Sequence, residues 1–293
     1  HLLLNLLLCQ INLFANWWNT LKKLPPIFQS LFCMVRQNNM TKLLIIAGLG
    51  PGDPKMVTPT VQEAISTATD IVGYIPYVAR IPPRDGLILH PSDNRVEIER
   101  AEFALDMAAS GKRVLIVSSG DPGVFAMAAA VFEIIDKNPI RWIDVEIQVL
   151  PGITAMLAAA AKIGAPLGHD FCALNLSDNL KPWELIEKRL LLAIEADFAM
   201  AFYNPRSKSR PEGFEKALNI LKSKCANDRP IVFARAISTP KEQIQILTLA
   251  QAKPEMADMQ TVVIIGSSET KVLLQNGKTF AYTPRYSKLG SAN

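Results

Sequence analysis

The sequence predicts an α/β protein made of two α/β domains. From Leu43 onward, short runs of β-branched residues alternate with longer segments of helical periodicity, which is typical of parallel α/β architecture. Apolar residues make up 49% of the 293 residues, so the chain can bury a core large enough for two modest domains.

The expected elements follow from these periodicities. Strands are predicted at 43–47, 113–118, 145–150, 198–203, 230–234 and 261–265. Helices are predicted at 58–68, 96–109, 124–135, 154–163, 182–195, 213–222 and 240–250. Gly111 fits a helix C-cap that leads directly into a strand. The charges of the 96–109 helix, including Arg100, predict an exposed, ion-paired face.

The clearest boundary is Leu150-Pro151-Gly152, where a strand ends before a new helix. We therefore expect an N-terminal α/β domain at 40–150 and a C-terminal α/β domain at 151–275. The sequence has little periodicity from about Lys271 onward. We expect a short hairpin or loop there, followed by a frayed end, and we assign 276–293 as the tail.

The first 39 residues differ from the rest. Their leucine-rich stretch is interrupted by Asn5, Gln10 and Asn12, so it is shorter than the ~20 apolar residues of a membrane span. It also lacks the basic start and the cleavage site of a signal peptide. We expect Met40 to be the natural start and 1–39 to be an atypical leader outside the fold, with an amphipathic membrane-surface helix as the alternative.

Composition excludes some classes of protein. The net charge of +4 is small and the basic residues are scattered, which disfavours a nucleic-acid binder. The four cysteines are far apart and show no metal-ligand spacing, so no metal site is predicted. Reduced thiols in a cytoplasmic protein are the expected state.

A glycine-rich loop, Gly48-Leu49-Gly50-Pro51-Gly52-Asp53, follows the first strand. A dinucleotide fingerprint would need a third glycine where Asp53 stands. Pro51 has no N–H to offer a phosphate, and the Asp53 carboxylate would repel one. The loop therefore suits a neutral or zwitterionic ligand better than a pyrophosphate.

Two similar turns follow later strands, Ser118-Ser119-Gly120-Asp121-Pro122-Gly123 and Leu150-Pro151-Gly152-Ile153-Thr154-Ala155. Ligands of α/β sheets bind beyond the carboxyl ends of strands. The three turns therefore predict one ligand-binding crevice.

With these motifs the chain resembles the tetrapyrrole (corrin/porphyrin) methylase family. The matching stretches are GLGPGD at 48–53, SSGDPGVF at 118–125, VLPGITA at 149–155 and TVVIIGSS at 261–268. The resemblance is strongest to a branch that methylates a precorrin on the way to vitamin B12, on the basis of 72–74, Tyr77 and 201–207.

The resemblance implies two α/β domains with a ligand trough between them, and S-adenosylmethionine as methyl donor. The donor-binding residues that it implies are Pro51, Ser119, Gly120, Asp121, Val124, Thr154, Ala155, Tyr203 and Ala236. It also implies a small-molecule tetrapyrrole substrate and a homodimer.

Methyl transfer depends mainly on positioning, but the ring contraction that this branch implies needs proton transfer. The groups to test for it are Asp53, Tyr74, Tyr77 and His90. Each also has a structural interpretation: Asp53 as a helix cap, the tyrosines as packing residues and His90 as a loop residue. The predicted substrate-binding residues, which would face carboxylates, are Arg206, Lys208, Arg210 and Arg235.

Other functions stay open at this point. A methylase of the same fold can act on a cobalt-containing intermediate, since metal carried by the substrate requires no protein ligands. Ribosomal RNA is disfavoured because no basic stripe with exposed aromatics is present. The alternative that the chain is an NAD(P)-dependent oxidoreductase is supported by the first glycine loop alone. A non-catalytic binding module is a further alternative. No nucleic-acid or membrane partner is expected.

Overall fold

The computed structural model describes residues 42–286. The expected leader, 1–39, and the end of the tail lie outside these residues. The described part begins with a five-stranded sheet in the order β3-β2-β4-β1-β5, in which every pair of neighbours is parallel. Its strands are β1 (Leu43–Gly48), β2 (Asp70–Tyr74), β3 (Ile88–Ser92), β4 (Arg113–Ser118) and β5 (Glu146–Leu150).

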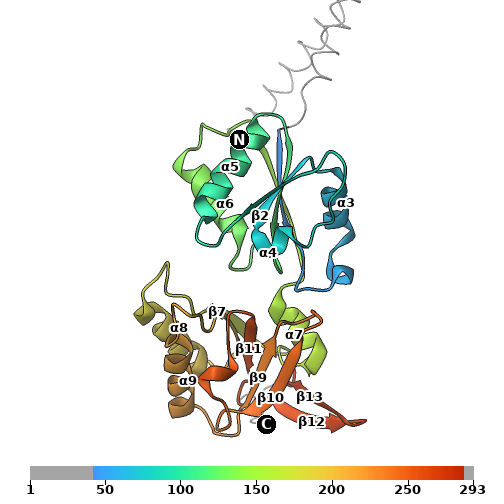
Figure 1. The fold of residues 1–293 in the computed structure, drawn as a ribbon. Coiled ribbons are helices and arrows are strands. Elements are labelled where there is room, and N and C mark those ends of the chain that lie inside the picture. Colours follow the sequence, from blue (N-terminus) through green and yellow to red (C-terminus); the bar gives the residue numbers. More distant parts are fainter. Residues whose placement is uncertain (1–41, 287–293) are drawn as a thin grey trace, which may run out of the picture. The chain divides into compact units, whose positions relative to one another are not determined.

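Helices cover both faces of this first sheet (Figure 1). They are α3 (Pro59–Thr67), α4 (Ile75–Val78), α5 (Glu97–Ala109) and α6 (Met127–Lys137), with a short 3-10 turn η1 (Pro54–Met56) before α3. Leu44 and Ile46 pack with α5 and α6, whereas Ala47 and Leu49 pack with α3. Both faces of the sheet are thus buried, which explains why its central strands read as continuous apolar runs.

The second sheet has the order β10-β9-β11-β8-β7. Its strands are β7 (Phe171–Asn175), β8 (Ala199–Tyr203), β9 (Pro230–Arg235), β10 (Gln243–Thr248) and β11 (Thr261–Ile265). Only β7 and β8 are parallel, and the other pairs are antiparallel. The expectation of parallel sheets is therefore confirmed for the first sheet and wrong for most of the second.

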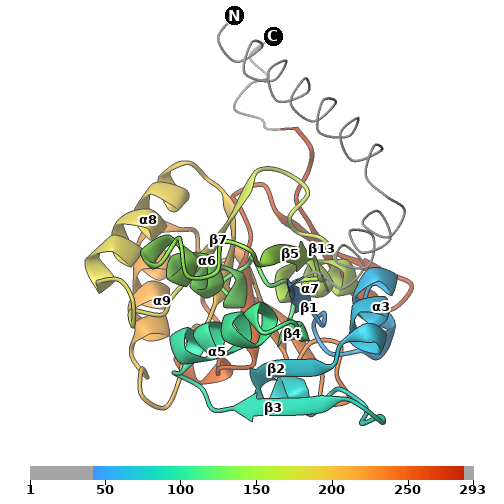
Figure 2. The same ribbon diagram turned by 90° about the horizontal axis from the view of Figure 1, so that it is seen from above.

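Helices again cover both faces of the second sheet. One face packs against α8 (Trp183–Glu195) and α9 (Gly213–Lys224), and the other packs against α7 (Ala155–Ile163). A 3-10 turn, η2 (Pro254–Met256), precedes β11. Figure 2 shows the same elements after a 90° turn, with β3 outermost beside β2.

The segment 240–250 is not the predicted helix. Gln243–Thr248 is strand β10, which pairs with β9 at the edge of the second sheet. In Gln243-Ile244-Gln245-Ile246 the polar residues are exposed and the isoleucines are partly buried, which is the two-residue period of a strand. The alternation of the side chains outweighed the helical propensity of this segment.

A small third sheet joins β12 (Lys271–Gln275), β13 (Lys278–Tyr282) and the short β6 (Gly164–Ala165). The β12–β13 pair is the hairpin expected near Lys271. Strand β13 lies within the predicted tail, yet it is parallel to β6, which directly follows α7. The proposed domain limits themselves stay a prediction.

Two details of the helices differ from expectation. Helix α6 begins at Met127 rather than at Val124, because Phe125 has a left-handed φ of 53° that a helix does not allow. Arg100 of α5 is 5% exposed, and its guanidinium donates to Ser92 Oγ at 2.8 Å and to the Asp93 carbonyl at 2.5 Å. It holds the end of β3 and is not part of an exposed ion-paired face.

Candidate active site

The three glycine turns meet at the carboxyl ends of the neighbouring strands β4, β1 and β5. Gly50 and Gly120 exchange two backbone hydrogen bonds, of 3.1 and 3.0 Å. A Cβ atom on Gly48 or on Gly152 would overlap the carbonyl oxygen of Gly120. Glycine is therefore required here for backbone-to-backbone approach, and the predicted meeting of the three turns is present in the structure.

Asp121 fastens the second turn to the third. Its Oδ1 accepts a hydrogen bond from Gly123 N at 2.8 Å, and its Oδ2 accepts one from Gly152 N at 3.0 Å. Both carboxylate oxygens thus bind loop backbone, although each oxygen retains capacity for a further donor. This contact makes Asp121 a positioning residue for the two turns, and its direct contact with a methyl donor stays a prediction.

Arg80 holds the first turn and was not found by sequence reasoning. Its guanidinium donates to the carbonyl oxygens of Leu49 at 2.5 Å, Gly50 at 3.2 Å and Gly52 at 3.4 Å. It comes from the turn after α4, where no sequence motif marks it. The loop carbonyls are thereby fixed by a permanent cation.

Tyr203 links the third turn to the second sheet. Its hydroxyl accepts a hydrogen bond from Met156 N at 3.0 Å and lies 2.5 Å from Thr154 Oγ1. Burial raises the pKa of the Tyr203 phenol, so it stays protonated at neutral pH. Thr154 is 4% exposed and is the N-cap residue of α7. The end of β8 is therefore joined to the start of α7.

Two further contacts bring residues of both sheets together. The ring of Phe125, in the segment between the second turn and α6, lies 5.3 Å from the ring of Tyr203, centroid to centroid. A Cβ atom on Gly52 would lie 2.8 Å from the Ser238 carbonyl oxygen, so the first turn touches the turn after β9. That turn contains Ala236, whose φ is 47°.

The structure thus gathers most of the predicted donor-binding residues. Pro51, Ser119, Gly120, Asp121, Thr154 and Ala155 belong to the three packed turns, and Val124 lies in the segment between the second turn and α6. Tyr203 joins them through Thr154. The Ala236 N–H donates to the Gln260 carbonyl at 2.8 Å, so this backbone donor is already used.

Tyr74 and Tyr77 lie at the same sheet edge. Tyr74 ends β2 and Tyr77 belongs to α4, and their rings meet edge to face at 5.3 Å. Burial, followed by Tyr74 as a second cause, raises the pKa of Tyr77. Tyr77 therefore keeps its proton at neutral pH and can act there as a hydrogen-bond donor or as an acid.

Asp53 caps a helical turn, which is the structural role considered for it from the sequence. Its side chain accepts a hydrogen bond from Lys55 N at 2.9 Å and caps the 3-10 turn η1. Its position in the first turn still places it at the edge where the turns meet. A catalytic role for Asp53 stays a prediction.

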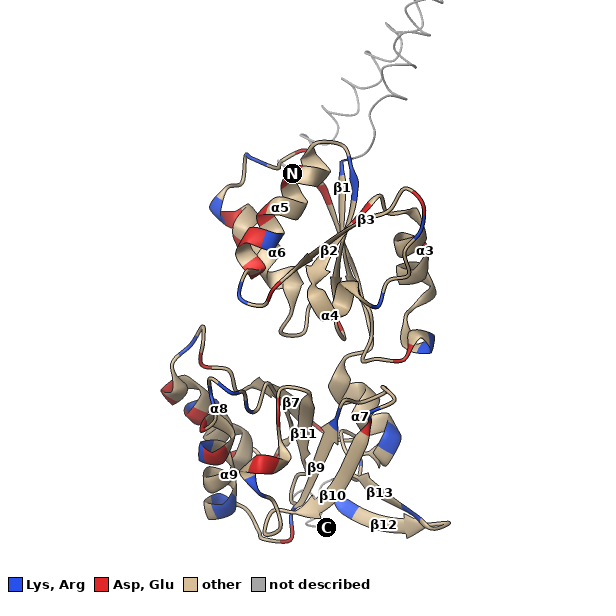
Figure 3. Cartoon of the chain, viewed as in Figure 1, with Lys and Arg blue, Asp and Glu red and all other residues tan. Residues whose placement is uncertain are grey.

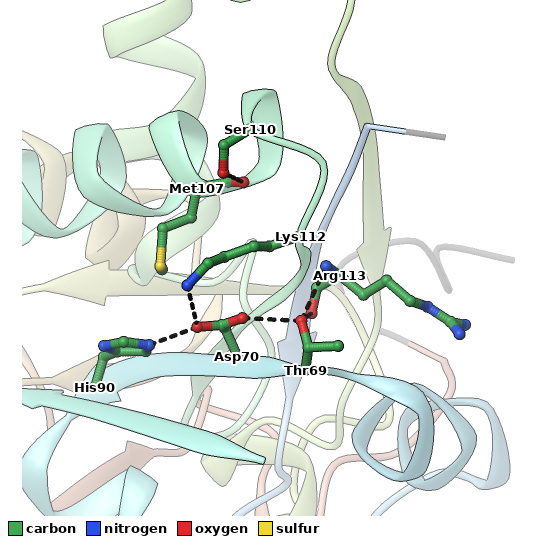
Figure 4. Close-up of polar contacts among 7 residues, drawn as sticks. All are labelled: Thr69, Asp70, His90, Met107, Ser110, Lys112 and Arg113. Atoms are coloured by element: carbon green, nitrogen blue, oxygen red, sulfur yellow. Dashed lines mark hydrogen bonds and ion pairs between the residues drawn. The ribbon is translucent and has the colours of Figure 1, made fainter. Parts of the chain in front are cut away.

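His90 is not brought to this edge. It lies on β3 rather than in a loop, and its Nε2 is 2.8 Å from Oδ1 of Asp70, the first residue of β2 (Figure 4). Asp70 is 2% exposed and also binds Lys112 Nζ at 3.0 Å and Thr69 Oγ1 at 2.8 Å. The ring of His90 therefore belongs to a cluster around the buried Asp70 at the amino end of β2, away from the glycine turns, and a catalytic role for His90 stays a prediction that this placement does not support.

The predicted substrate-binding residues fall into two groups. Arg206, Lys208 and Arg210 lie in the segment between β8 and α9, where Ser207 and Arg210 exchange two backbone hydrogen bonds of 3.2 Å. Arg235 instead donates from Nε to Asp258 Oδ2 at 2.8 Å. The Nε donor of Arg235 is therefore already used in this ion pair with Asp258, and a role in substrate binding stays a prediction.

Three further findings concern metal binding, membrane spanning and the position of a cavity. Within residues 42–286, no cluster of three or more His, Cys, Asp or Glu side chains could hold a metal ion. In the same part of the chain, no helix has both the length and the apolar character needed to cross a bilayer. A cavity of about 370 Å³ is lined by Arg229, Thr248, Ser267 and Ser268, at the amino end of β9 and not at the glycine turns.

The fold and the meeting of three glycine turns are typical of the class of α/β proteins that bind a ligand at the carboxyl ends of their strands. Residues 43–253 match the Tetrapyrrole (Corrin/Porphyrin) Methylases, and the chain belongs to this family. This membership overturns the NAD(P)-dependent oxidoreductase alternative.

Two curated relatives show which members of the family this chain is similar to. A Precorrin-3B C(17)-methyltransferase of Sinorhizobium sp is 52% identical over 248 residues, which are 84% of this chain and 98% of the relative. A Probable cobalt-factor III C(17)-methyltransferase of Salmonella typhimurium is 38% identical over 250 residues, which are 83% of this chain and 98% of the relative.

Two solved structures of methyltransferases are also similar to this chain. The crystal structure of the methyltransferase CobJ is 60% identical, has a TM-score of 0.79, and is matched over 83% of this chain and 99% of that chain. A uroporphyrin-III C-methyl transferase from Thermus thermophilus, complexed with S-adenyl homocysteine, is 20% identical with a TM-score of 0.58, over 76% of this chain and 96% of that chain. The second likeness shows the shared fold.

Proposed function

We propose that this chain transfers a methyl group from S-adenosylmethionine to carbon 17 of precorrin-3B, with ring contraction to precorrin-4, in cobalamin biosynthesis. The observation that carries the proposal is the 52% identity to a relative with that name across 98% of its length. The lower identity of 38% to a cobalt-factor III enzyme makes the metal-free substrate the better choice.

The glycine turns fit this donor better than a phosphate-bearing ligand. The N–H groups of Gly50 and Gly120, which would otherwise face an anion, bond to each other's carbonyls, and Pro51 has no N–H. The Asp121 carboxylate lies among these turns. A donor without phosphate, with a cationic sulfonium and an ammonium group, is compatible with such a site.

The donor supplies an activated methyl group, and the residues of the chain supply position and proton control. Arg80 and Asp121 fix the three turns, and this rigidity holds the reacting atoms in line. Phe125 and Tyr203 offer aromatic surface next to Thr154, which suits the adenine. We propose Tyr77, protonated at neutral pH, as the first group to test for proton donation during ring contraction, with Tyr74 and Asp53 as further candidates.

The proposal includes a tetrapyrrole as the small-molecule substrate, a homodimer as the assembly and the cytoplasm as the location. The assembly is tested by light scattering after size-exclusion chromatography of the full chain. A mass of twice 32.2 kDa would support the dimer, and a mass of one chain would contradict it.

The function is tested in two stages on the full chain. Isothermal titration with S-adenosylhomocysteine and separately with NADH should give micromolar binding of the first and none of the second. Turnover of precorrin-3B and of cobalt-factor III should then be followed by mass spectrometry. A mass gain of one methyl on precorrin-3B supports the proposal, whereas turnover of the cobalt substrate alone assigns the alternative, and binding without turnover of either assigns a binding module.

A further inference from the structure

The segments that follow β7 and β8 lie side by side at the edge of the second sheet. These two strands are parallel neighbours, so both segments leave the same edge. Leu176 N donates to the Tyr203 carbonyl at 3.0 Å, and Asn204 Nδ2 donates to Asn175 Oδ1 at 3.2 Å. The segment 176–182 therefore begins beside the segment 204–212, which holds the predicted substrate-binding residues Arg206, Lys208 and Arg210.

Basic residues from the first of these segments lie within electrostatic range of basic residues from α8 and from the second segment. Lys181, which precedes α8, interacts electrostatically with Arg189 of α8 and with Arg210. Burial, then Arg189, and to a smaller extent Arg210 lower the pKa of Lys181, whereas Asp178 opposes them. Figure 3 shows basic positions along the chain where it enters α8 and α9. Three cations thus share one region with one carboxylate.

These three cations have no ion-pair partner in the described part of the chain. Salt bridges elsewhere join Arg229 to Asp197, Arg235 to Asp258 and Lys216 to Glu212. Among residues 42–286, no carboxylate lies within 4.0 Å of the charged nitrogens of Lys181, Arg189 or Arg210, and Arg210 instead donates to Met259 Sδ at 3.7 Å. Three like charges with only one carboxylate, Asp178, in their region repel one another, and a ligand that carries several carboxylates would relieve this repulsion.

Apolar side chains stand exposed beside these cations. Leu180, next to Lys181 in the chain, is 99% exposed, and Met259, which Arg210 contacts, is 46% exposed. A tetrapyrrole combines a broad apolar ring with carboxylate side chains around its rim. Exposed apolar groups flanked by unpaired cations match both parts of such a ligand.

We propose that Lys181 and Arg189 bind side-chain carboxylates of the tetrapyrrole together with Arg210, so that the segment between β7 and α8 forms a second wall of the substrate site. This inference rests on the proposed function. It adds two substrate-binding residues that no sequence motif marks, and it assigns them to the rim of the substrate and not to the reacting carbon.

The test uses steady-state kinetics of the full chain with precorrin-3B. Lys181→Met and Arg189→Met should each raise the KM for the tetrapyrrole about three- to tenfold, as expected for a partly exposed charge pair. Neither variant should change kcat or the Kd for S-adenosylhomocysteine. Lys181→Arg should keep a near-normal KM. The matched control is Lys188→Met, because Lys188 is an exposed neighbour of Arg189 on the same helix.

A second readout separates charge recognition from structural damage. The fall of kcat/KM with rising ionic strength should be shallower in Lys181→Met than in the parent chain, because one attractive charge is missing. A tetrapyrrole KM within twofold of the parent in both variants would overturn the inference, as would an equal rise in the Lys188 control. If the parent chain does not methylate precorrin-3B at all, the proposed function fails and this inference fails with it.

Discussion

The hydroxyl of Tyr203 and Oγ1 of Thr154 lie 2.5 Å apart, and this contact joins the end of β8 to the N-terminus of α7. It connects the second sheet to the third glycine turn, which the Gly152–Asp121 hydrogen bond attaches to the second turn, and Gly50 and Gly120 join the second turn to the first. The predicted donor site therefore depends on a chain of contacts that crosses from one sheet to the other.

Tyr203→Phe should weaken donor binding. The change removes the hydroxyl that binds both Met156 N and Thr154, and each lost hydrogen bond is worth ~1 kcal/mol. We expect the Kd for S-adenosylhomocysteine to rise about five- to tenfold in isothermal titration. Tyr286→Phe serves as control, because Tyr286 is 64% exposed. An unchanged Kd in Tyr203→Phe would mean that this contact does not shape the site.

Arg80→Met should reduce activity more than stability. The first turn would lose three donors to its carbonyl oxygens, and a mispositioned loop lowers the rate by ~10- to 100-fold. The comparison is kcat/KM against that of Arg113→Met, which removes an arginine from the exposed first position of β4. Equal effects of the two variants would contradict a positioning role for Arg80.

Gly152→Ala should destabilise the protein. The added methyl group would overlap the Gly120 carbonyl oxygen, and overpacking of this kind costs ~1–3 kcal/mol. Gly86→Ala provides the comparison, because an added Cβ at Gly86 has nothing within 4 Å, so that variant introduces only the backbone strain of a φ of 77° and no overlap. Urea denaturation should show the larger loss for Gly152→Ala together with weaker donor binding. A larger loss at Gly86 would contradict the close packing of the turns.

The Asp70 cluster predicts a pH-dependent stability that is separate from activity. Burial opposes ionisation of Asp70, but hydrogen bonds from His90, Lys112 and Thr69 outweigh it and lower its pKa below 3.8. A carboxyl group whose pKa is lower in the folded state stabilises the fold above its unfolded pKa, and this contribution is lost as the pH falls through the folded pKa.

Asp70→Asn should therefore lower the free energy of unfolding at pH 7 by ~2–3 kcal/mol, because Lys112 and His90 lose their anion. The gap to the parent chain should narrow below about pH 4, as chemical denaturation across pH would show. His90→Gln should lower stability by a smaller amount and leave kcat near the parent value. A large loss of kcat in His90→Gln would instead support the predicted catalytic role of His90.

Much of the fold follows from local patterns. Strands such as Thr261–Ile265 are continuous apolar runs and are predictable because both of their faces are buried. Strand β3 was missed because Ile88-Leu89-His90-Pro91-Ser92 contains a proline and a histidine, which edge strands tolerate. The mixed direction of the second sheet depends on pairings between distant segments and leaves no local signal.

The site was predictable where backbone chemistry restricts the sequence. Gly48 and Gly152 are required by close approach and Gly120 by its left-handed φ of 61°, so the three turns could be recognised as motifs in the sequence. Arg80 acts through a long side chain whose partners are distant in sequence, and no motif marks it or the proposed substrate-binding residue Lys181. In the sequence His90 is equivalent to the other titratable candidates, and only its contact of 2.8 Å with Asp70 in the structure separates it from them.

The most direct test of the proposed function is the position of the transferred methyl group. The full chain is incubated with precorrin-3B and S-adenosylmethionine labelled with ¹³C in its methyl group, and the product is examined by NMR. The proposal predicts one labelled methyl at carbon 17 of a ring-contracted product. Label at another carbon, or no label in the tetrapyrrole, would contradict it.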